Sequence, residues 1–203
     1  MSKIKIFALG GLNENGKDMY VVKVDKDIFI FDAGLKYDTD INLGIDYIIP
    51  GYQYLIDNKS NIKGIFLTHG HASNMGALPD ILKDVPDLNV YGTLLTLEVL
   101  KSYMTKEEIS NYNLIELKPH NKIKFGDNAI FPISVTHSIP GAVCYVLYTL
   151  DGAIVYTGDF VFDSTMLGDY KTDIGKLAYV GKQGVLCLMS ESIYANKVGD
   201  SYE

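Results

Sequence analysis

Hydrophobic and polar residues fall in short runs along most of the chain, a pattern that favours β-strands joined by tight turns. Lys3–Ala8 alternates with a period of two, as a strand with one buried face does. Two wholly apolar runs, 65–67 and 185–189, are expected to form buried strands. Further strands are predicted at 20–24, 28–31, 122–125, 129–135, 143–150 and 153–156, with hairpin breaks at 25–27, 126–128 and 151–152.

The spacing becomes helical at 75–86 and again at 94–105. We expect Pro79 in the first turn of its helix, because a helix interior does not tolerate proline. The chain is therefore predicted to be a strand-rich α/β layer protein. The residues expected to share a buried face are Leu78, Ile81, Leu82 and Val85 in the first helix, and Leu97, Leu100, Tyr103 and Met104 in the second.

Composition narrows the class of protein. The 203 residues are 47% hydrophobic, which fits a folded domain and excludes a disordered chain. No apolar run approaches the roughly 18 residues of a membrane span, and the N-terminus lacks a clean apolar leader segment, so a cytoplasmic protein is expected. Cys144 and Cys187 lie in apolar runs, where reduced core thiols are favoured over a disulfide or a metal role.

The charge argues against a chain that binds nucleic acid on its own. All 18 basic residues are lysine, against 25 acidic residues, for a net charge of −7. Phosphate affinity comes from clustered basic side chains, and this chain has an acidic excess instead.

Candidate ligands for a metal follow several of the predicted strands. His69-Gly70-His71 follows 65–67, His137 follows 133–135, and Asp159 follows 154–156. Each alone could be a loop histidine or a turn aspartate. Together they could line one edge of a sheet, with Gly70 permitting the turn, and three imidazoles with a carboxylate suit Zn²⁺.

Two further polar residues are ambiguous. Asp32 also follows a strand and could orient a ligand histidine from behind, or simply initiate a turn. His120 is expected to be a surface histidine.

The order Asp32-Ala33-Gly34, Thr68-His69-Gly70-His71, His137 and Thr157-Gly158-Asp159 resembles the metallo-β-lactamase superfamily. Longer stretches resemble the ribonuclease J group of β-CASP nucleases, in particular its catalytically degenerate paralogues. These stretches are 8–12, 43–50, 64–71, 136–140, 157–163 and 184–190.

The resemblance implies an αββα sandwich of which this chain is the N-terminal segment. Residues 1–190 would be the first part of the lactamase domain. Residues 191–203 would start a truncated β-CASP junction, with Glu191 as its acidic residue. The fold would be incomplete without the β-CASP module and the C-terminal return of the lactamase domain, which in the family carries one more metal-binding histidine.

The chain departs from the family's H-x-H-x-D-H motif. Ser73 stands in place of the aspartate and Asn74 in place of the final histidine. A hydroxyl and an amide are weak ligands for zinc and poor bases, so no catalytic residue is secure. By the resemblance, the ligands of the first metal are His69, His71, His137 and Asp159. We expect at most one zinc ion, acting as a structural staple, with an empty relic site as the alternative.

The resemblance implies a function in RNA processing or decay as a non-catalytic or weakly active subunit. Its expected partner is a homologous active ribonuclease J-type subunit, or a second copy of itself. Contact with RNA is expected only when the missing β-CASP module is present. No contact with a membrane is expected. Three alternatives stay open: a residual exo- or endoribonuclease with a single metal site, a small-molecule hydrolase such as a lactonase, and a nonfunctional fragment.

Overall fold

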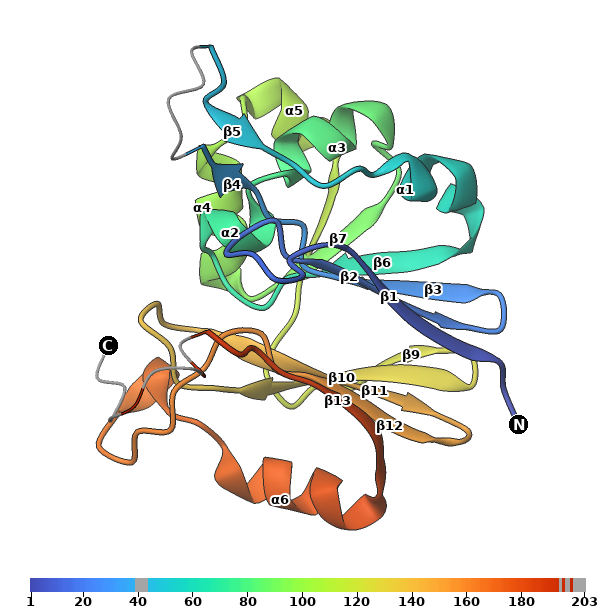
Figure 1. Cartoon of the computed structure of the whole chain (residues 1–203), viewed down its shortest axis with the longest axis vertical. Helices are drawn as coiled ribbons and strands as arrows, with labels where there is room; N and C mark the ends of the chain where they lie inside the picture. The colour runs from blue at the N-terminus through green and yellow to red at the C-terminus, as the bar shows by residue number, and fades with distance from the viewer. Residues whose placement is uncertain (39–43, 194, 196–197, 199–203) are drawn as a thin grey trace.

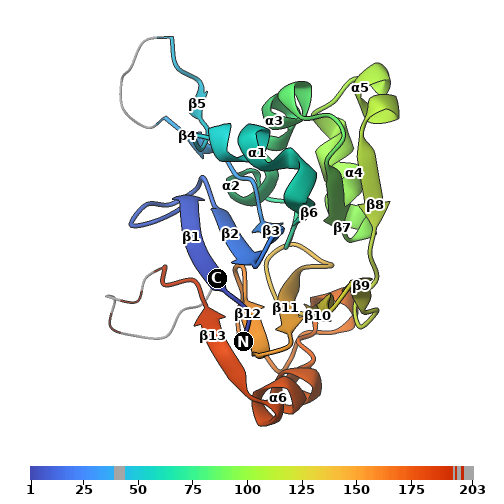
Figure 2. The ribbon, with the colours of Figure 1, turned by 90° about the vertical axis from the view of Figure 1, so that its right-hand side faces the viewer.

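Two β-sheets pack face to face in the middle of the molecule, with helices on both outer sides (Figures 1 and 2). The computed structural model describes residues 1–38, 44–193, 195 and 198. Their arrangement confirms the predicted αββα sandwich.

The first sheet has six strands in the order β1-β2-β3-β6-β7-β8. Strand β1 pairs antiparallel with β2 and β2 with β3, whereas β3, β6, β7 and β8 run parallel. Helices cover its outer face (Figure 1). The strands are β1 (Ile4–Gly10), β2 (Met19–Val24), β3 (Asp27–Phe31), β6 (Ile62–Phe66), β7 (Asn89–Gly92) and β8 (Asn113–Glu116). The helices are α1 (Gln53–Asn58), α2 (Ala72–Met75), α3 (Leu78–Asp84), α4 (Leu94–Ser102) and α5 (Lys106–Asn111).

The second sheet has five strands in the order β13-β12-β11-β10-β9, and α6 packs on its outer face (Figure 1). Strands β9 to β12 form an antiparallel meander, and β13 adds parallel to β12. The elements are β9 (Ile123–Phe125), β10 (Asn128–Ser134), β11 (Val143–Thr149), β12 (Gly152–Tyr156), α6 (Ile174–Gln183) and β13 (Val185–Met189). A two-stranded ribbon, β4 (Lys36–Tyr37) with β5 (Tyr47–Ile48), and two short 3₁₀ helices (Lys59–Asn61 and Gly168–Tyr170) complete the described structure.

Three layers of buried side chains hold the sandwich together. One joins the first sheet to its helices, one lies between the sheets, and one joins the second sheet to α6. The middle layer is rich in aromatic rings, including Phe31, Phe66 and Tyr145, whose centroids lie 5.8–6.0 Å apart. Since burial of these rings excludes water between the sheets, the middle layer positions the two sheet edges relative to each other.

The predicted strands are confirmed in position, but the burial of the last strand is not. Strand β13 was expected to be buried, yet Leu186 is 53% exposed and Leu188 is 63% exposed. The reason is that β13 is an edge strand, with β12 on one side and no described strand on the other. Both cysteines are free thiols, as expected, but Cys187 on β13 is only half-buried while Cys144 is buried.

The helical regions are confirmed with altered boundaries. Within the predicted region 75–86 only 78–84 is the helix α3, and Met75 is the last residue of the preceding α2; Pro79 lies in the first turn of α3 as predicted. The second helix ends at Ser102, and α5 begins afresh with a capping box between Thr105 and Glu108. Tyr103, predicted to lie on the buried face of α4, is 49% exposed because it follows the last turn.

Some predictions concern residues outside the described part of the chain. The similar stretch 43–50 is described only from residue 44, and of the proposed junction 191–203 only 191–193, 195 and 198 are described. Among the described residues, no helix is long and apolar enough to cross a bilayer.

Candidate metal centre

Three imidazoles converge where the two sheets meet. His69 follows β6, His71 is the residue before α2, and His137 follows β10 of the second sheet. The expectation of a single sheet edge is therefore wrong, because the site is shared between the facing edges of two sheets. His71 Nδ1 lies 3.1 Å from His69 Nε2 and 3.1 Å from His137 Nε2.

This triangle of nitrogen atoms fits a metal ion. Ligand atoms around a tetrahedral zinc ion with bonds of about 2.0–2.1 Å lie roughly 3.3 Å apart. Within the described part of the chain, the metal-ligating group that converges in this way is formed by His69, His71 and His137, whose ligand atoms all lie within 4.8 Å of one another. The three histidines can therefore hold a metal ion.

Burial keeps the three rings neutral, as ligands must be. Burial, aided by the rings of His137 and His71, lowers the pKa of His69 to about 2. Burial and His71 lower the pKa of His137 to about 4, and burial also lowers the pKa of His71. A neutral imidazole has a lone pair to donate to a cation, so the site is ready to bind without losing protons.

The turns around the histidines depend on close packing. Gly70 was expected to permit the turn between His69 and His71 through the conformational freedom of glycine. Its φ is not positive, so the turn does not depend on that freedom. A Cβ at Gly70 would lie 3.2 Å from Ile139 Cδ1, so a larger residue there would have to displace the end of the Ile139 side chain. Around His137, the peptide of Thr136 is held by Val161 and Thr172 through bonds of 2.8 Å each.

Asp159 lies beside the triangle without being part of it. Its Oδ2 atom is 3.7 Å from His69 Nε2, and burial raises the pKa of its carboxyl group. The preceding Gly158 has a φ of +57°, and a Cβ there would lie 2.7 Å from Thr68 Cγ2, so glycine brings Asp159 close to the histidines. The role of Asp159 as a fourth ligand stays a prediction.

Ser73 bonds to Asn74, and Asn74 bonds in turn to Asp32. Ser73 Oγ donates to Asn74 Oδ1 at 2.6 Å, and Asn74 Nδ2 donates to Asp32 Oδ2 at 3.0 Å. Asn74 is fully buried, so both ends of its amide are used within the protein. Neither residue supplies a carboxylate or an imidazole.

Asp32 is a buried hub and not an isolated turn residue. It is fully buried, has a φ of +59°, and accepts hydrogen bonds from Thr68, Asn74 and Tyr156. Burial raises the pKa of Asp32, and these donors oppose the rise. Asp32 has no direct bond to an imidazole; the link to His69 passes through the Thr68 hydroxyl, which lies 3.0 Å from His69 Nδ1.

Two remaining predicted residues lie away from the triangle. Glu191 Oε1 accepts a hydrogen bond of 2.9 Å from the Phe160 amide, so it holds the loop that follows Asp159. Burial raises the pKa of Glu191. Its role as a junction acid stays a prediction. His120 is exposed, as expected, and lies 3.3 Å from an Asp173 carboxylate oxygen.

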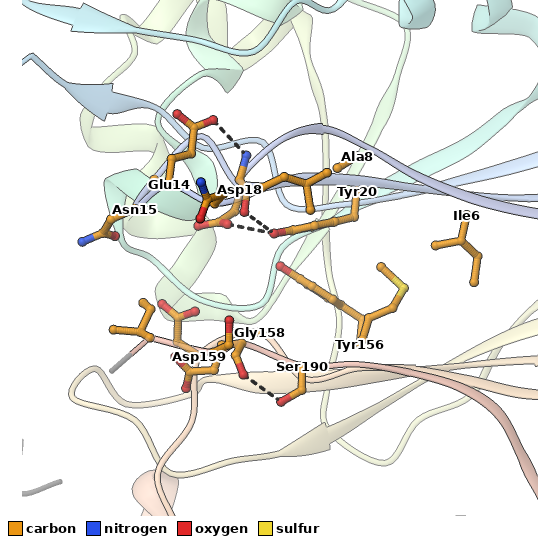
Figure 3. A pocket seen from close by; sticks show the side chains of 18 of the residues that line it. Ile6, Ala8, Glu14, Asn15, Asp18, Tyr20, Tyr156, Gly158, Asp159 and Ser190 are labelled. Atoms are coloured by element: carbon orange, nitrogen blue, oxygen red, sulfur yellow. Dashed lines mark hydrogen bonds between the residues drawn. The ribbon is translucent and has the colours of Figure 1, made fainter. Parts of the chain in front are cut away.

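A cavity of about 810 Å³ opens beside the metal centre, between β1 and β2 on one side and β12 and β13 on the other (Figure 3). Four carboxylates line it: Glu14, Asp18, Asp159 and Glu191. Asp18 and Asp159 come from opposite walls (Figure 3).

Asp18 was not identified as a candidate from the sequence. In the structure, burial and the charges of Asp32 and Asp159 raise its pKa to about 7. Its backbone N–H donates to Ser73 O at 3.1 Å, which places it beside the altered motif. An aspartate just before a strand carries no signal of this proximity, which comes from the packing of segments 55 residues apart.

Comparison with known proteins agrees with this geometry. The family model described as a β-lactamase superfamily domain matches residues 41–174, about two-thirds of the chain. The chain belongs to the β-lactamase superfamily.

Its similarity to the ribonuclease J group is confirmed by curated relatives. The chain is 42% identical over 199 residues to Ribonuclease J 2 of Streptococcus pyogenes serotype M3, covering 96% of this chain and 35% of the relative. It is also 42% identical to Ribonuclease J 2 of Staphylococcus saprophyticus, covering 97% of this chain and 35% of that relative. The chain thus spans about a third of the length of the curated relatives it matches.

Solved structures support the fold. A protein of unknown function from Enterococcus faecalis V583 has a TM-score of 0.72 at 18% identity, covering 100% of this chain and 53% of that one. The metallo-β-lactamase fold protein YhfI from Bacillus subtilis has a TM-score of 0.59 at 14% identity, covering 81% and 66%.

Proposed function

We propose that this chain is the metal-binding lactamase segment of a ribonuclease J-type protein of RNA processing or decay, and that it is non-catalytic or weakly active by itself. The names of its relatives support the RNA-processing role. The observation that carries the proposal is the ligand set, since three histidines converge while Ser73 and Asn74 are hydrogen-bonded to each other.

The chemistry of the ligand set is the reason to expect little or no activity. Hydrolysis by a two-metal site needs one ion to supply hydroxide and both ions to clamp the reacting phosphate. Ser73 lacks the charge for a second cation, and the amide of Asn74 is committed to Asp32. We therefore propose that the chain binds at most one metal ion.

We assign that ion as Zn²⁺, bound by His69, His71 and His137 with Asp159 as the fourth ligand. Neutral imidazoles and one carboxylate are the donors that zinc prefers. With four protein ligands, zinc supplies a structural link and no open position for a reactive water. Because the ligands come from both sheets, the site would fasten one sheet to the other.

The partner is proposed to be an active ribonuclease J-type subunit, with self-association as the other form of assembly. The net charge of −7 and the four carboxylates of the cavity disfavour a polyanion at this surface. We therefore assign RNA contact to a β-CASP module, which would follow a junction that starts near Glu191. Residues 1–190 are assigned to the lactamase domain. The proposed location is the cytoplasm.

One observation favours a second candidate, a weak ribonuclease with a single metal. The backbone of Asp18 is hydrogen-bonded to that of Ser73, and Asp18 lines the same cavity as Asp159. In that case Asp18 would replace the missing motif aspartate as the base that accepts a proton from water.

Two measurements test the proposal together: metal content by mass spectrometry on protein purified without chelator, and hydrolysis of end-labelled RNA with and without EDTA. The proposal expects about one zinc per chain in the wild type, none in His69→Ala, and no EDTA-sensitive hydrolysis. The matched control is His120→Ala, which removes an exposed histidine outside the site.

Other outcomes separate the alternatives. Hydrolysis that EDTA, His69→Ala and Asp18→Asn each abolish would establish the single-metal ribonuclease. Two ions per chain would mean that Ser73 and Asn74 do support a second site, and none would indicate an empty relic. Sedimentation of the chain mixed with an active homologous subunit tests the partner.

A further inference from the structure

We propose that Asn74 is a positioning residue for the first metal ion: through Asp32 and Thr68 it holds His69 in the tautomer whose Nε2 lone pair faces the ion. The inference rests on the proposed metal site. It gives a function to a residue at a position where the family pattern has a ligand of a second metal.

The first step is the Asp32 carboxylate, which acts as an acceptor on both oxygens. Oδ1 receives the backbone N–H of Thr68 at 2.8 Å, and Oδ2 receives Asn74 Nδ2 at 3.0 Å and the Tyr156 hydroxyl at 2.8 Å. The residue is fully buried, and it keeps a left-handed backbone that is uncommon outside glycine. These donors, which come from three other segments, fix the plane of the carboxylate.

The second step is the Thr68 hydroxyl, which has a single proton. Thr68 Oγ1 donates to Asp32, at 2.8 Å from Oδ2 and 3.0 Å from Oδ1. The same oxygen lies 3.0 Å from His69 Nδ1, and with its own proton directed at the carboxylate it can only accept there. His69 Nδ1 must therefore carry the proton, which leaves Nε2 with a free lone pair.

The third step is the direction of that lone pair. His69 Nε2 is the atom 3.1 Å from His71 Nδ1 and 3.7 Å from Asp159 Oδ2. The free nitrogen thus faces the triangle, and the protonated nitrogen faces the protein. A ligand histidine fixed by a hydrogen bond on its other nitrogen binds metal more tightly than one free to change tautomer.

Asn74 connects this chain of hydrogen bonds to a second ligand. It lies on α2, whose preceding residue is His71. Its amide can face Asp32 only through nitrogen, because the carboxylate accepts, and Ser73 Oγ donates to the opposite end at 2.6 Å. The Ser73–Asn74 pair therefore fixes the Asp32 carboxylate, and through it Thr68 and His69.

The test is the tautomer of His69 in metal-free protein, read from long-range ¹H–¹⁵N NMR spectra of ¹⁵N-histidine-labelled chain. The chain has four histidines, so single-histidine variants assign the signals. We expect Nδ1–H in the wild type, and a mixture with Nε2–H in Asn74→Leu and Thr68→Val. Zinc affinity should fall about 10–100-fold in both variants.

Two controls separate positioning from general loss of structure. Thr68→Ser keeps the hydroxyl and should restore both the tautomer and the zinc affinity. Thr96→Val removes another buried hydroxyl, whose partner is Thr93, and should leave both unchanged.

The wild-type spectrum tests the inference even if a variant fails to fold, and an Nε2–H signal for His69 would overturn it. Unchanged tautomer and affinity in folded Asn74→Leu would also overturn it. If the tautomer depends on Asn74 but the chain binds no zinc, the proposed metal centre fails while the hydrogen-bonded chain stands.

Discussion

Asp18 offers a sharp test of the electrostatics of the cavity, through the substitution Asp18→Asn in metal-free protein. The side chain lies in an acidic wall, near Asp32 and Asp159, and the Tyr20 hydroxyl donates to it at 3.3 Å. Asparagine has nearly the same shape and keeps an oxygen for Tyr20. The substitution therefore removes the charge and little else.

The sign follows from the direction of the pKa change. Burial raises the pKa of Asp18 from 3.8 to about 7, so the folded chain holds this proton more tightly than the unfolded chain. Stability is then lost as the pH rises from about 4 to about 7, and is level above that. At about 1.4 kcal/mol per pKa unit, the ionised form costs the fold at most about 4 kcal/mol, and about 2–4 kcal/mol after allowance for partial exposure.

The assay is urea unfolding, followed by circular dichroism in EDTA, across pH 4–8. We expect Asp18→Asn to match the wild type near pH 4 and to exceed it by about 2–4 kcal/mol at pH 8. Asp87→Asn, which removes one negative charge at an exposed aspartate outside the cavity, serves as the matched control. An Asp18→Asn protein that gains nothing between pH 4 and pH 8 would refute the reasoning.

Three further predictions concern the metal, the core and the edge strand. Zinc at 100 times its Kd adds about 2.7 kcal/mol, so Tm should rise by about 5–11 °C, and a rise that persists in His137→Ala would exclude the proposed ligands. Tyr145→Phe removes a buried bond of 2.6 Å to Leu67 O, so it should cost about 1–3 kcal/mol in urea unfolding, and an unchanged midpoint would contradict this. Leu188→Lys on β13 should reduce self-association in sedimentation experiments, whereas Leu150→Lys, at a 74% exposed turn residue, should have no effect.

Most of the strands were predictable because their signals are local, but β4, β5, β7 and β8 were not predicted. The hairpin indicated by Asp151-Gly152 follows from turn chemistry, and it appears between β11 and β12 with its turn at Leu150-Asp151, one residue earlier than predicted. Whether a strand is covered depends on its neighbours in the sheet, which the periodicity of the strand does not encode. For that reason the position of β13 is correct and its burial is not.

The candidate site, too, was predictable only where its signals are local in the sequence. Histidines after strands predicted convergence, but not that His137 would reach the others from a second sheet. Ligand chemistry identified Asn74 as a weak ligand, while its bond to Asp32, 42 residues earlier, is a tertiary contact with no local signal. Asp18 was missed for the same physical reason.

The cavity beside the metal centre lies between the same two sheets that the histidines join. Any small molecule that enters it and holds the sheets apart would move His137 away from His69 and His71. By thermodynamic reciprocity, the factor by which such a compound weakens metal binding is the factor by which metal weakens binding of the compound. Metal affinity can therefore serve as a reporter in a search for ligands of the cavity.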